Sequence, residues 1–250
     1  MPPFHRADGN HSARPLAPAF LASVTCVAEA RLALDAGADL IDCKDPKTGA
    51  LGALPPATIK NVVAVVAGAK PVSATIGDLP TEPPAMVAAA EAIAATGVDI
   101  VKVGFFGSCD ARPAIAALGQ ARLAQARLVA VLMADSRPDL NVIPDLAGAG
   151  FYGVMLDTAD KTAGPLTNVA SMAFLAEFLG LSRDSGLIAG LAGSLQRRDI
   201  ATLIPLRPDI LGFRGALCRE GRTSVLDAAR TAAIRNDIWL AAGACSEPVG

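Results

Sequence analysis

Histidine is scarce in this chain of 250 residues: there are two, His5 and His11, and both precede the first long apolar segment. We interpret residues 1–18, which are polar and rich in proline, as a flexible N-terminal tail. The folded part would then contain no histidine, which excludes catalysis by Ser-His-Asp or Cys-His groups and zinc bound through histidine. Acid–base chemistry must come from lysine, carboxylates, Tyr152 or a thiol.

Other absences each remove a class of protein. The five cysteines show no CxxC spacing, which is typical of small, reduced core thiols in a cytoplasmic protein. The net charge is −2 and there is no dense run of Lys and Arg, so we expect no nucleic-acid or membrane-surface partner. No apolar run reaches the ~18 residues of a transmembrane helix, and the N-terminus lacks the apolar region of a signal peptide.

Hydrophobic residues make up 52% of the chain, and they alternate between two kinds of segment. Short β-type runs predict strands at Phe20–Thr25, Leu40–Cys43, Pro71–Ile76, Asp99–Gly104, Leu128–Met133, Gly153–Leu156, Leu187–Leu191 and Ile210–Phe213. Each is followed by Ala- and Leu-rich sequence that predicts helices at Val27–Ala36, Thr58–Ala67, Pro84–Ala95, Arg112–Ala126, Val142–Ala149, Ser171–Ser182, Leu195–Ile204 and Ser224–Ile234. Eight strand–helix units with no spare element predict an α/β fold, a single (β/α)8 TIM barrel over residues 19–240, with 241–250 as a C-terminal tail.

Charged side chains interrupt three predicted strands, although strands of a parallel barrel are buried on both faces and should be apolar. Asp42 and Lys44 are two residues apart and therefore share one face of their strand. Lys102 lies between valines, and Asp157 closes a strand that Lys161 follows four residues later. The carboxyl ends of barrel strands form the active-site rim, so these five groups should converge there. A structural ion pair explains any one of these pairs equally well, but three charged strands together favour an active site.

Lysine is used sparingly, with six lysines against 16 arginines. Lysines retained inside apolar strands indicate that a neutral, nucleophilic amine is needed, which arginine does not supply. Burial and a second ammonium both lower the pKa of a lysine, whereas a carboxylate such as Asp42 raises it. Lys44 and Lys102 could balance these effects, one as the nucleophile and the other as a proton shuttle.

The loops after the last two predicted strands are candidates for binding phosphate, because barrels often bind phosphate there through backbone N–H groups. Gly193 and Ser194 lie in the first loop, and Gly215 and Ala216 lie in the second, where Arg214 adds positive charge. The alternative for the first loop is a tight turn in which Ser194 caps a helix.

Thr75 and Asp78 are expected to line the same mouth. A magnesium site of Asp42, Asp78 and Asp157 is conceivable, but no metal-ligand spacing supports it, so we expect neither a metal nor a cofactor.

Four segments resemble the (5-formylfuran-3-yl)methyl phosphate synthase family, also called 4-(hydroxymethyl)-2-furancarboxaldehyde phosphate synthase, of methanofuran biosynthesis. They are LALDAGADLIDCKDPKTGALGA, PVSATIGDLP, GVDIVKVGFFG and GVMLDTADK. The resemblance covers nearly the whole folded part and implies a (β/α)8 barrel. It also implies that Lys44 forms a Schiff base, that Lys102 accepts a proton, and that Asp42, Asp157 and Lys161 are further acidic and basic groups of the site.

The resemblance further implies a lyase that condenses two glyceraldehyde 3-phosphate molecules into a furan aldehyde phosphate, with loss of phosphate and water. The partner would be a phosphorylated triose. Two alternatives remain: a class I aldolase or sugar-phosphate isomerase on the same barrel, and a non-catalytic sensor of a phosphorylated ligand. Apolar helix sequence such as VVAVVAGA indicates a homo-oligomer, although packing of helices on strands explains it equally well.

Overall fold

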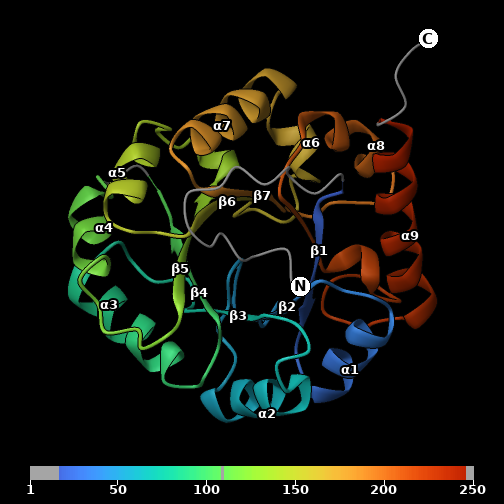
Figure 1. Ribbon diagram of the computed structural model, residues 1–250, viewed down its shortest axis with the longest axis horizontal. Helices are drawn as coiled ribbons and strands as arrows, with labels where there is room; N and C mark the ends of the chain where they lie inside the picture. Colours follow the sequence, from blue (N-terminus) through green and yellow to red (C-terminus); the bar gives the residue numbers. More distant parts are fainter. Residues whose placement is uncertain (1–16, 108–109, 246–250) are drawn as a thin grey trace.

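The computed structural model describes residues 17–107 and 110–245, which contain a closed barrel of eight parallel strands in chain order (Figure 1). The strands are β1 Ala19–Val24, β2 Leu40–Cys43, β3 Val72–Thr75, β4 Ile100–Phe105, β5 Arg127–Met133, β6 Gly153–Asp157, β7 Ile188–Leu191 and β8 Ile210–Phe213. Each overlaps a predicted strand, and the predicted TIM barrel is confirmed. The predicted N-terminal tail lies outside the described residues, apart from Ala17 and Pro18.

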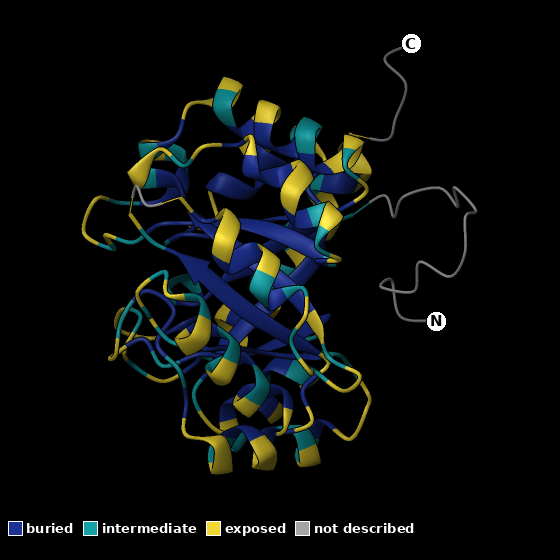
Figure 2. Ribbon diagram, turned by 90° about the vertical axis from the view of Figure 1, so that its left-hand side faces the viewer, coloured by how far each residue is buried: buried dark blue, intermediate teal, exposed yellow. Residues whose placement is uncertain are grey.

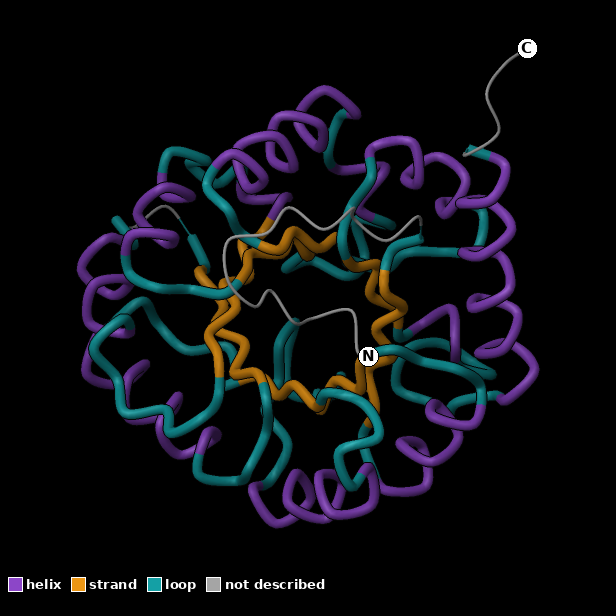
Figure 3. The backbone as a smooth tube through the Cα atoms, in the orientation of Figure 1, coloured by secondary structure: helices purple, strands orange, loops and turns teal. Residues whose placement is uncertain are grey.

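Helices surround the ring of strands, as the tube in Figure 3 shows. The α-helices are α1 Val27–Asp35, α2 Pro56–Val66, α3 Pro83–Ala94, α4 Arg112–Leu118, α5 Val142–Gly148, α6 Leu166–Val169, α7 Met172–Asp184, α8 Asp199–Leu203 and α9 Ala228–Ala244. Short 3-10 turns are η1 Ala134–Ser136, η2 Ile204–Leu206 and η3 Gly215–Leu217. Within the described residues, no helix has the length and apolarity needed to cross a bilayer.

Three helix predictions were wrong at their ends. Helix α4 ends at Leu118 instead of Ala126, because Gly119 packs so tightly on α5 that a Cβ would lie 2.6 Å from the Ala149 carbonyl oxygen. Helix α8 begins only at Asp199 and passes into η2, whose proline lacks the N–H that an α-helix needs.

Helix α9 begins at Ala228 instead of Ser224, because the Asp227 carboxylate caps it by accepting a hydrogen bond from the Arg230 backbone N–H. It continues to Ala244, past the expected boundary at 240, and Ala242 is buried against the barrel. The short helix α6 was not predicted.

The apolar side chains form two layers. One fills the space between strands and helices and includes Ile59, Val62 and Val66 of α2. These residues account for the apolar helix sequence by packing on strands. The other layer, with Leu40 and Val131, fills the inside of the barrel. In Figure 2 the strands are buried, and the exposed residues lie on the surrounding helices and loops.

The cysteines of the described residues form no disulfide. Cys43 and Cys218 are buried, and burial raises the pKa of both thiols. Cys26 and Cys245 are exposed, so the prediction of core thiols was wrong for these two. Both lie at helix ends, next to α1 and α9. Cys109 lies outside the described residues.

Candidate active site

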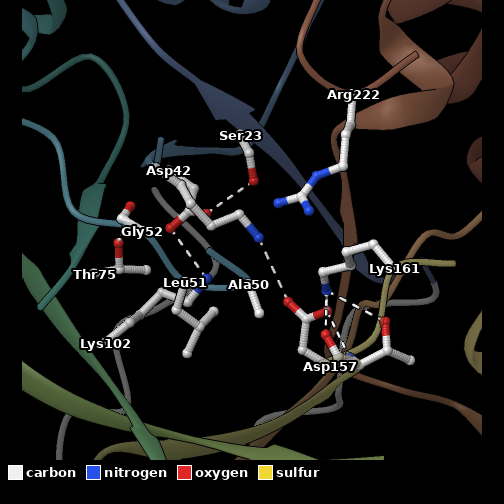
Figure 4. Close-up of polar contacts among 12 residues, drawn as sticks. Ser23, Asp42, Ala50, Leu51, Gly52, Thr75, Lys102, Asp157, Lys161 and Arg222 are labelled. Atoms are coloured by element: carbon white, nitrogen blue, oxygen red, sulfur yellow. Dashed lines mark hydrogen bonds and ion pairs between the residues drawn. The ribbon is translucent and has the colours of Figure 1, made fainter. Parts of the chain in front are cut away.

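A cavity of about 460 Å³ opens at the carboxyl ends of the strands, where the charged residues converge (Figure 4). Lys44, Lys102, Asp157 and Lys161 line it, and Asp42 is fully buried against Lys102. The structure therefore brings together all five charged residues singled out in the sequence. The volume lies within the range of small-molecule sites.

Asp42 lies in a row of inward-facing residues on adjacent strands, because Ser23 of β1 and Ser73 of β3 pair with it in register. Both hydroxyls donate hydrogen bonds to its carboxylate, at 2.9 and 2.7 Å, and Lys102 Nζ donates a third at 3.1 Å. Burial raises the pKa of Asp42, but the charges of Lys102 and Lys44 and these hydrogen bonds outweigh it, so the pKa lies below its usual value. Asp42 is therefore a fixed anion beneath the cavity.

Asp157 at the end of β6 is shared between two lysines. Lys161 Nζ lies 2.5 Å from one carboxylate oxygen, and Lys44 Nζ lies 3.5 Å from the other. Lys161 also donates to the Thr158 carbonyl and hydroxyl oxygens. Burial raises the pKa of Asp157, but the two lysines outweigh this effect and lower it. Lys44 thus has the looser contact with the shared carboxylate.

The Lys161 ammonium is less stable in its charged form than an ordinary lysine. Burial is the largest cause of its lowered pKa, and nearby Lys44 and Arg222 lower it further, against the opposing effect of Asp157. A lysine with a lowered pKa is a better proton donor near neutral pH. Lys161 therefore suits acid–base chemistry.

The loop between β2 and α2 follows Lys44 and is held by hydrogen bonds to residues at the end of β3 and just after it. The Asp78 carboxylate accepts 2.7 Å hydrogen bonds from the backbone N–H groups of Ala50 and Leu51. Gly49 has φ of +136°, and a Cβ there would lie 2.2 Å from Asp78. Leu51 is fully buried over the barrel interior. Two of the family-like segments, those containing Gly49 and Asp78, thus meet in one rigid structure.

Asp78 and Thr75 were expected to line the mouth of the barrel, but they form hydrogen bonds to this loop instead. The Thr75 hydroxyl donates to the Gly52 carbonyl at 3.0 Å, so both residues hold the loop. The conceivable magnesium site is not assembled either: Asp78 binds backbone N–H groups, whereas Asp42 and Asp157 pair with lysines. Within residues 17–107 and 110–245, no His, Cys, Asp or Glu side chains group as metal ligands.

Three of the four residues predicted to bind phosphate line the cavity: Gly193, Ser194 and Gly215. Ala216 does not line the cavity, because its side chain packs against the apolar layer between strands and helices. Gly193 and Ser194 both have positive φ, +103° and +49°, which gives a sharp turn after β7. Ser194 is not a helix cap, since Arg198 occupies that position at α8.

We expected the Arg214 side chain to offer its positive charge to a phosphate, but the structure shows it paired with a carboxylate. Its guanidinium forms a buried ion pair with Glu29, with NH1 2.6 Å from Oε2. It also donates to the backbone carbonyls of Arg222, Ser224 and Ser23. Arg214 therefore fixes the loop between β8 and α9.

Comparison with known proteins shows which family this chain belongs to. A family model described as 4-HFC-P synthase matches residues 20–235. The chain belongs to the 4-HFC-P synthase family. A Methylorubrum extorquens protein provisionally named (5-formylfuran-3-yl)methyl phosphate synthase is 47% identical over 216 residues, covering 86% of this chain and 89% of that protein. The (5-formylfuran-3-yl)methyl phosphate synthase of Archaeoglobus fulgidus is 35% identical over 218 residues, covering 82% and 93%.

Solved structures place this 4-HFC-P synthase family member among TIM barrels. The 3-hexulose-6-phosphate synthase of Salmonella typhimurium superimposes with a TM-score of 0.64, at 15% identity over 89% of this chain and 99% of that one. A phosphoribosyl anthranilate isomerase of Thermus thermophilus gives 0.62, at 14% identity over 89% and 98%. At this identity the likeness shows the fold alone.

In this member of the 4-HFC-P synthase family, sequence reasoning missed several polar residues that line the cavity. They are Ser23, Gln196, Arg198, Arg222 and Arg230. The loop after β8 contains a signal for one of them, because Arg222 closes a basic stretch at the same end of the barrel as the strand-borne lysines. The sequence around Arg198 and Arg230 contains no comparable pattern that would predict that these side chains line the cavity.

Proposed function

We propose that this chain is a (5-formylfuran-3-yl)methyl phosphate synthase, a lyase that forms its product through a Schiff base on Lys44 and needs no metal. The observation that carries the proposal is the convergence of three lysines and Asp157 in one cavity, with the buried Asp42 paired to Lys102, in a member of the 4-HFC-P synthase family. The substrate is glyceraldehyde 3-phosphate, and the site works inside a cytoplasmic protein.

The reaction begins with one triose phosphate at the ketone level, reached by moving a proton from C2 to C1 of the aldehyde. The Lys44 amine adds to the ketone, and loss of one water gives an iminium. Lys44 suits this role because its contact with Asp157, at 3.5 Å, is the longest of the ion pairs in the charged cluster, so little holds it in place. The iminium withdraws electrons, so the neighbouring C–H becomes acidic.

Lys102 then takes the proton from this carbon, and Asp42 stabilises the resulting ammonium at 3.1 Å. The enamine attacks the aldehyde carbon of a second glyceraldehyde 3-phosphate, and its oxygen takes up a proton. Lys161 and Asp157 relay protons to the departing hydroxyl and phosphate oxygens. Ring closure and hydrolysis of the iminium free Lys44. In total, two triose phosphates give one furan aldehyde phosphate, one inorganic phosphate and two waters.

The test is to incubate the protein with glyceraldehyde 3-phosphate, reduce with borohydride and measure the intact mass. We expect one covalent adduct, which Lys44→Ala abolishes and which Lys47→Ala, on the same loop but exposed, retains. An equal adduct in Lys44→Ala would reject Lys44 as the nucleophile. Ultraviolet absorbance of the furan separates this function from an aldolase, an isomerase or a sensor, since none of these forms the chromophore.

A further inference from the structure

The cations that line the cavity fall into two groups. Lys44, Lys102 and Lys161 belong to the charged cluster at the strand ends, whereas the arginines belong to the surrounding loops and helices. Arginine is permanently charged and presents a planar fork that matches phosphate, but it does not act as a nucleophile or a base. This division separates the groups suited to chemistry from the groups suited to holding an anion.

Arg222 lies beside the charged cluster, close enough for its charge to lower the pKa of Lys161. Its NH2 donates to the Gly49 carbonyl at 2.9 Å, so its side chain reaches from the β8–α9 loop to the β2–α2 loop. Figure 4 shows its guanidinium pointing into the space between Ser23 and Lys161. Among contacts with residues 17–107 and 110–245, the bond to Gly49 is the one hydrogen bond that this guanidinium donates. The remaining N–H groups are available to a ligand.

The position of Arg222 is fixed from behind by Arg214. Arg214 Nε donates to the Arg222 carbonyl at 2.9 Å, and the Arg214 guanidinium is locked by the buried pair with Glu29. A long side chain that is held at its backbone and again at its tip loses less freedom on binding a ligand. Arg222 is thus preorganised over the cavity.

We propose that Arg222 binds the phosphate of the second glyceraldehyde 3-phosphate, the one whose aldehyde is attacked. This inference rests on the proposed function, in which two phosphorylated trioses occupy one cavity. Gly193, Ser194 and Gly215, together with Arg198 and Arg230, then hold the phosphate of the triose attached to Lys44. The first site is formed by the segments after β7 and β8. Arg222 also comes from the β8–α9 loop, but its bond to the Gly49 carbonyl places its guanidinium next to the β2–α2 loop.

Arg222 is half-buried near three carboxylates, those of Asp157, Asp78 and Asp45. Burial and the charge of Arg214 lower the pKa of its guanidinium, and these carboxylates oppose the shift without cancelling it. These carboxylates do not form an ion pair with Arg222 within the described residues, so its charge is left for an anion. A bound phosphate would complete the neutralisation.

The experiment compares Arg222→Gln and Arg222→Lys with the control Arg219→Gln, which removes an exposed arginine from the same loop. Furan formation is followed by absorbance against the glyceraldehyde 3-phosphate concentration, with and without inorganic phosphate. We expect Arg222→Gln to raise KM roughly 10- to 100-fold, with a smaller change in kcat, and to weaken inhibition by phosphate in parallel. Arg222→Lys keeps the charge but loses the fork, so its KM should be intermediate. Arg219→Gln should match the wild type.

Two controls keep the outcomes apart. Borohydride trapping with dihydroxyacetone phosphate alone should give the wild-type adduct in Arg222→Gln, because the first triose uses the other anion site. An unchanged KM and unchanged phosphate inhibition in either Arg222 variant overturns the assignment, as does a fall in kcat alone. If Arg222→Gln does not fold, Arg222→Lys decides. Failure of the proposed function itself would appear differently, as a wild-type protein that gives neither adduct nor furan.

Discussion

Asp42 and Lys102 form an ion pair across the width of a strand: one lies on β2 and the other on β4, and their charged atoms are 3.1 Å apart. Their side chains are 0% and 4% exposed. Such a pair gains little over an apolar pair, but removing one partner leaves an uncompensated charge in the interior. Replacing either residue alone should therefore destabilise the barrel.

Asp42→Asn should lower the free energy of unfolding by about 3 kcal/mol at pH 7, because Lys102 would remain buried without its anion. Urea unfolding followed by circular dichroism measures this. Ser73→Ala is the matched control: it removes one hydrogen bond to the same carboxylate and should cost about 1.5 kcal/mol. Equal losses in the two variants would mean that the ion pair contributes nothing of its own.

The difference between the wild type and Asp42→Asn should depend on pH. The pKa of Asp42 is lowered in the folded protein, so the carboxylate contributes its full stability above the unfolded value of about 3.9. That contribution is lost as the pH falls through the lower pKa of the folded state. We expect the difference in unfolding free energy between the wild type and Asp42→Asn to be the same at pH 7 and pH 5 and smaller at pH 3. Urea unfolding at the three pH values measures it. A gap of the same size at all three would contradict the assigned shift.

Lys161→Met and Lys161→Arg should both reduce kcat for furan formation by about 100-fold or more, because neither side chain transfers a proton near neutral pH. The adduct on Lys44 should still form, so borohydride trapping separates binding from later steps. Lys60→Met, on the exposed face of α2, is the control and should behave as the wild type. High activity in Lys161→Arg would show that charge alone is required.

Gly49→Ala should destabilise the β2–α2 loop, since its Cβ would lie 2.2 Å from the Asp78 carboxylate and its φ is +136°. We expect a loss of about 3 kcal/mol, larger than the ~1–2 kcal/mol of a positive φ alone. Gly68→Ala isolates that second contribution, because Gly68 also has a positive φ, +74°, with nothing within 4 Å of a Cβ. Thermal unfolding of the pair tests the difference, and equal losses would exclude the contact with Asp78.

Arg214→Met should cost about 3–5 kcal/mol, because it leaves Glu29 buried without its cation. In the folded protein, burial raises the pKa of Glu29, but the pairing with Arg214 outweighs it and lowers the pKa. Glu29→Gln combined with Arg214→Met should recover part of the loss, and chemical unfolding of the three variants gives the coupling energy. Additive losses would show that the two residues do not act as a pair.

Local spacing in the sequence was sufficient for the barrel and for the charged cluster. The two-residue interval between Asp42 and Lys44 places both on one face, and strand ends meet at one rim whatever the details of the helices. Long-range pairing was not predictable. The partner of Arg214 is Glu29, 185 residues earlier, and nothing in either local sequence reveals the other. The predicted end of α4 was wrong for a related reason, because the contact of Gly119 with Ala149 joins two separate strand–helix units.

The apolar residues inside the barrel determine how substrates enter the cavity and how products leave it. Leu21, Leu40 and Met155 are almost fully buried below the charged cluster, and Met155 occupies the space left by Gly190. Among the described residues, these apolar side chains therefore fill the barrel below the cavity. In the proposed reaction, the released phosphate and the incoming trioses would then share the opening at the carboxyl ends of the strands, so the phosphate has to leave before the next pair of substrates binds.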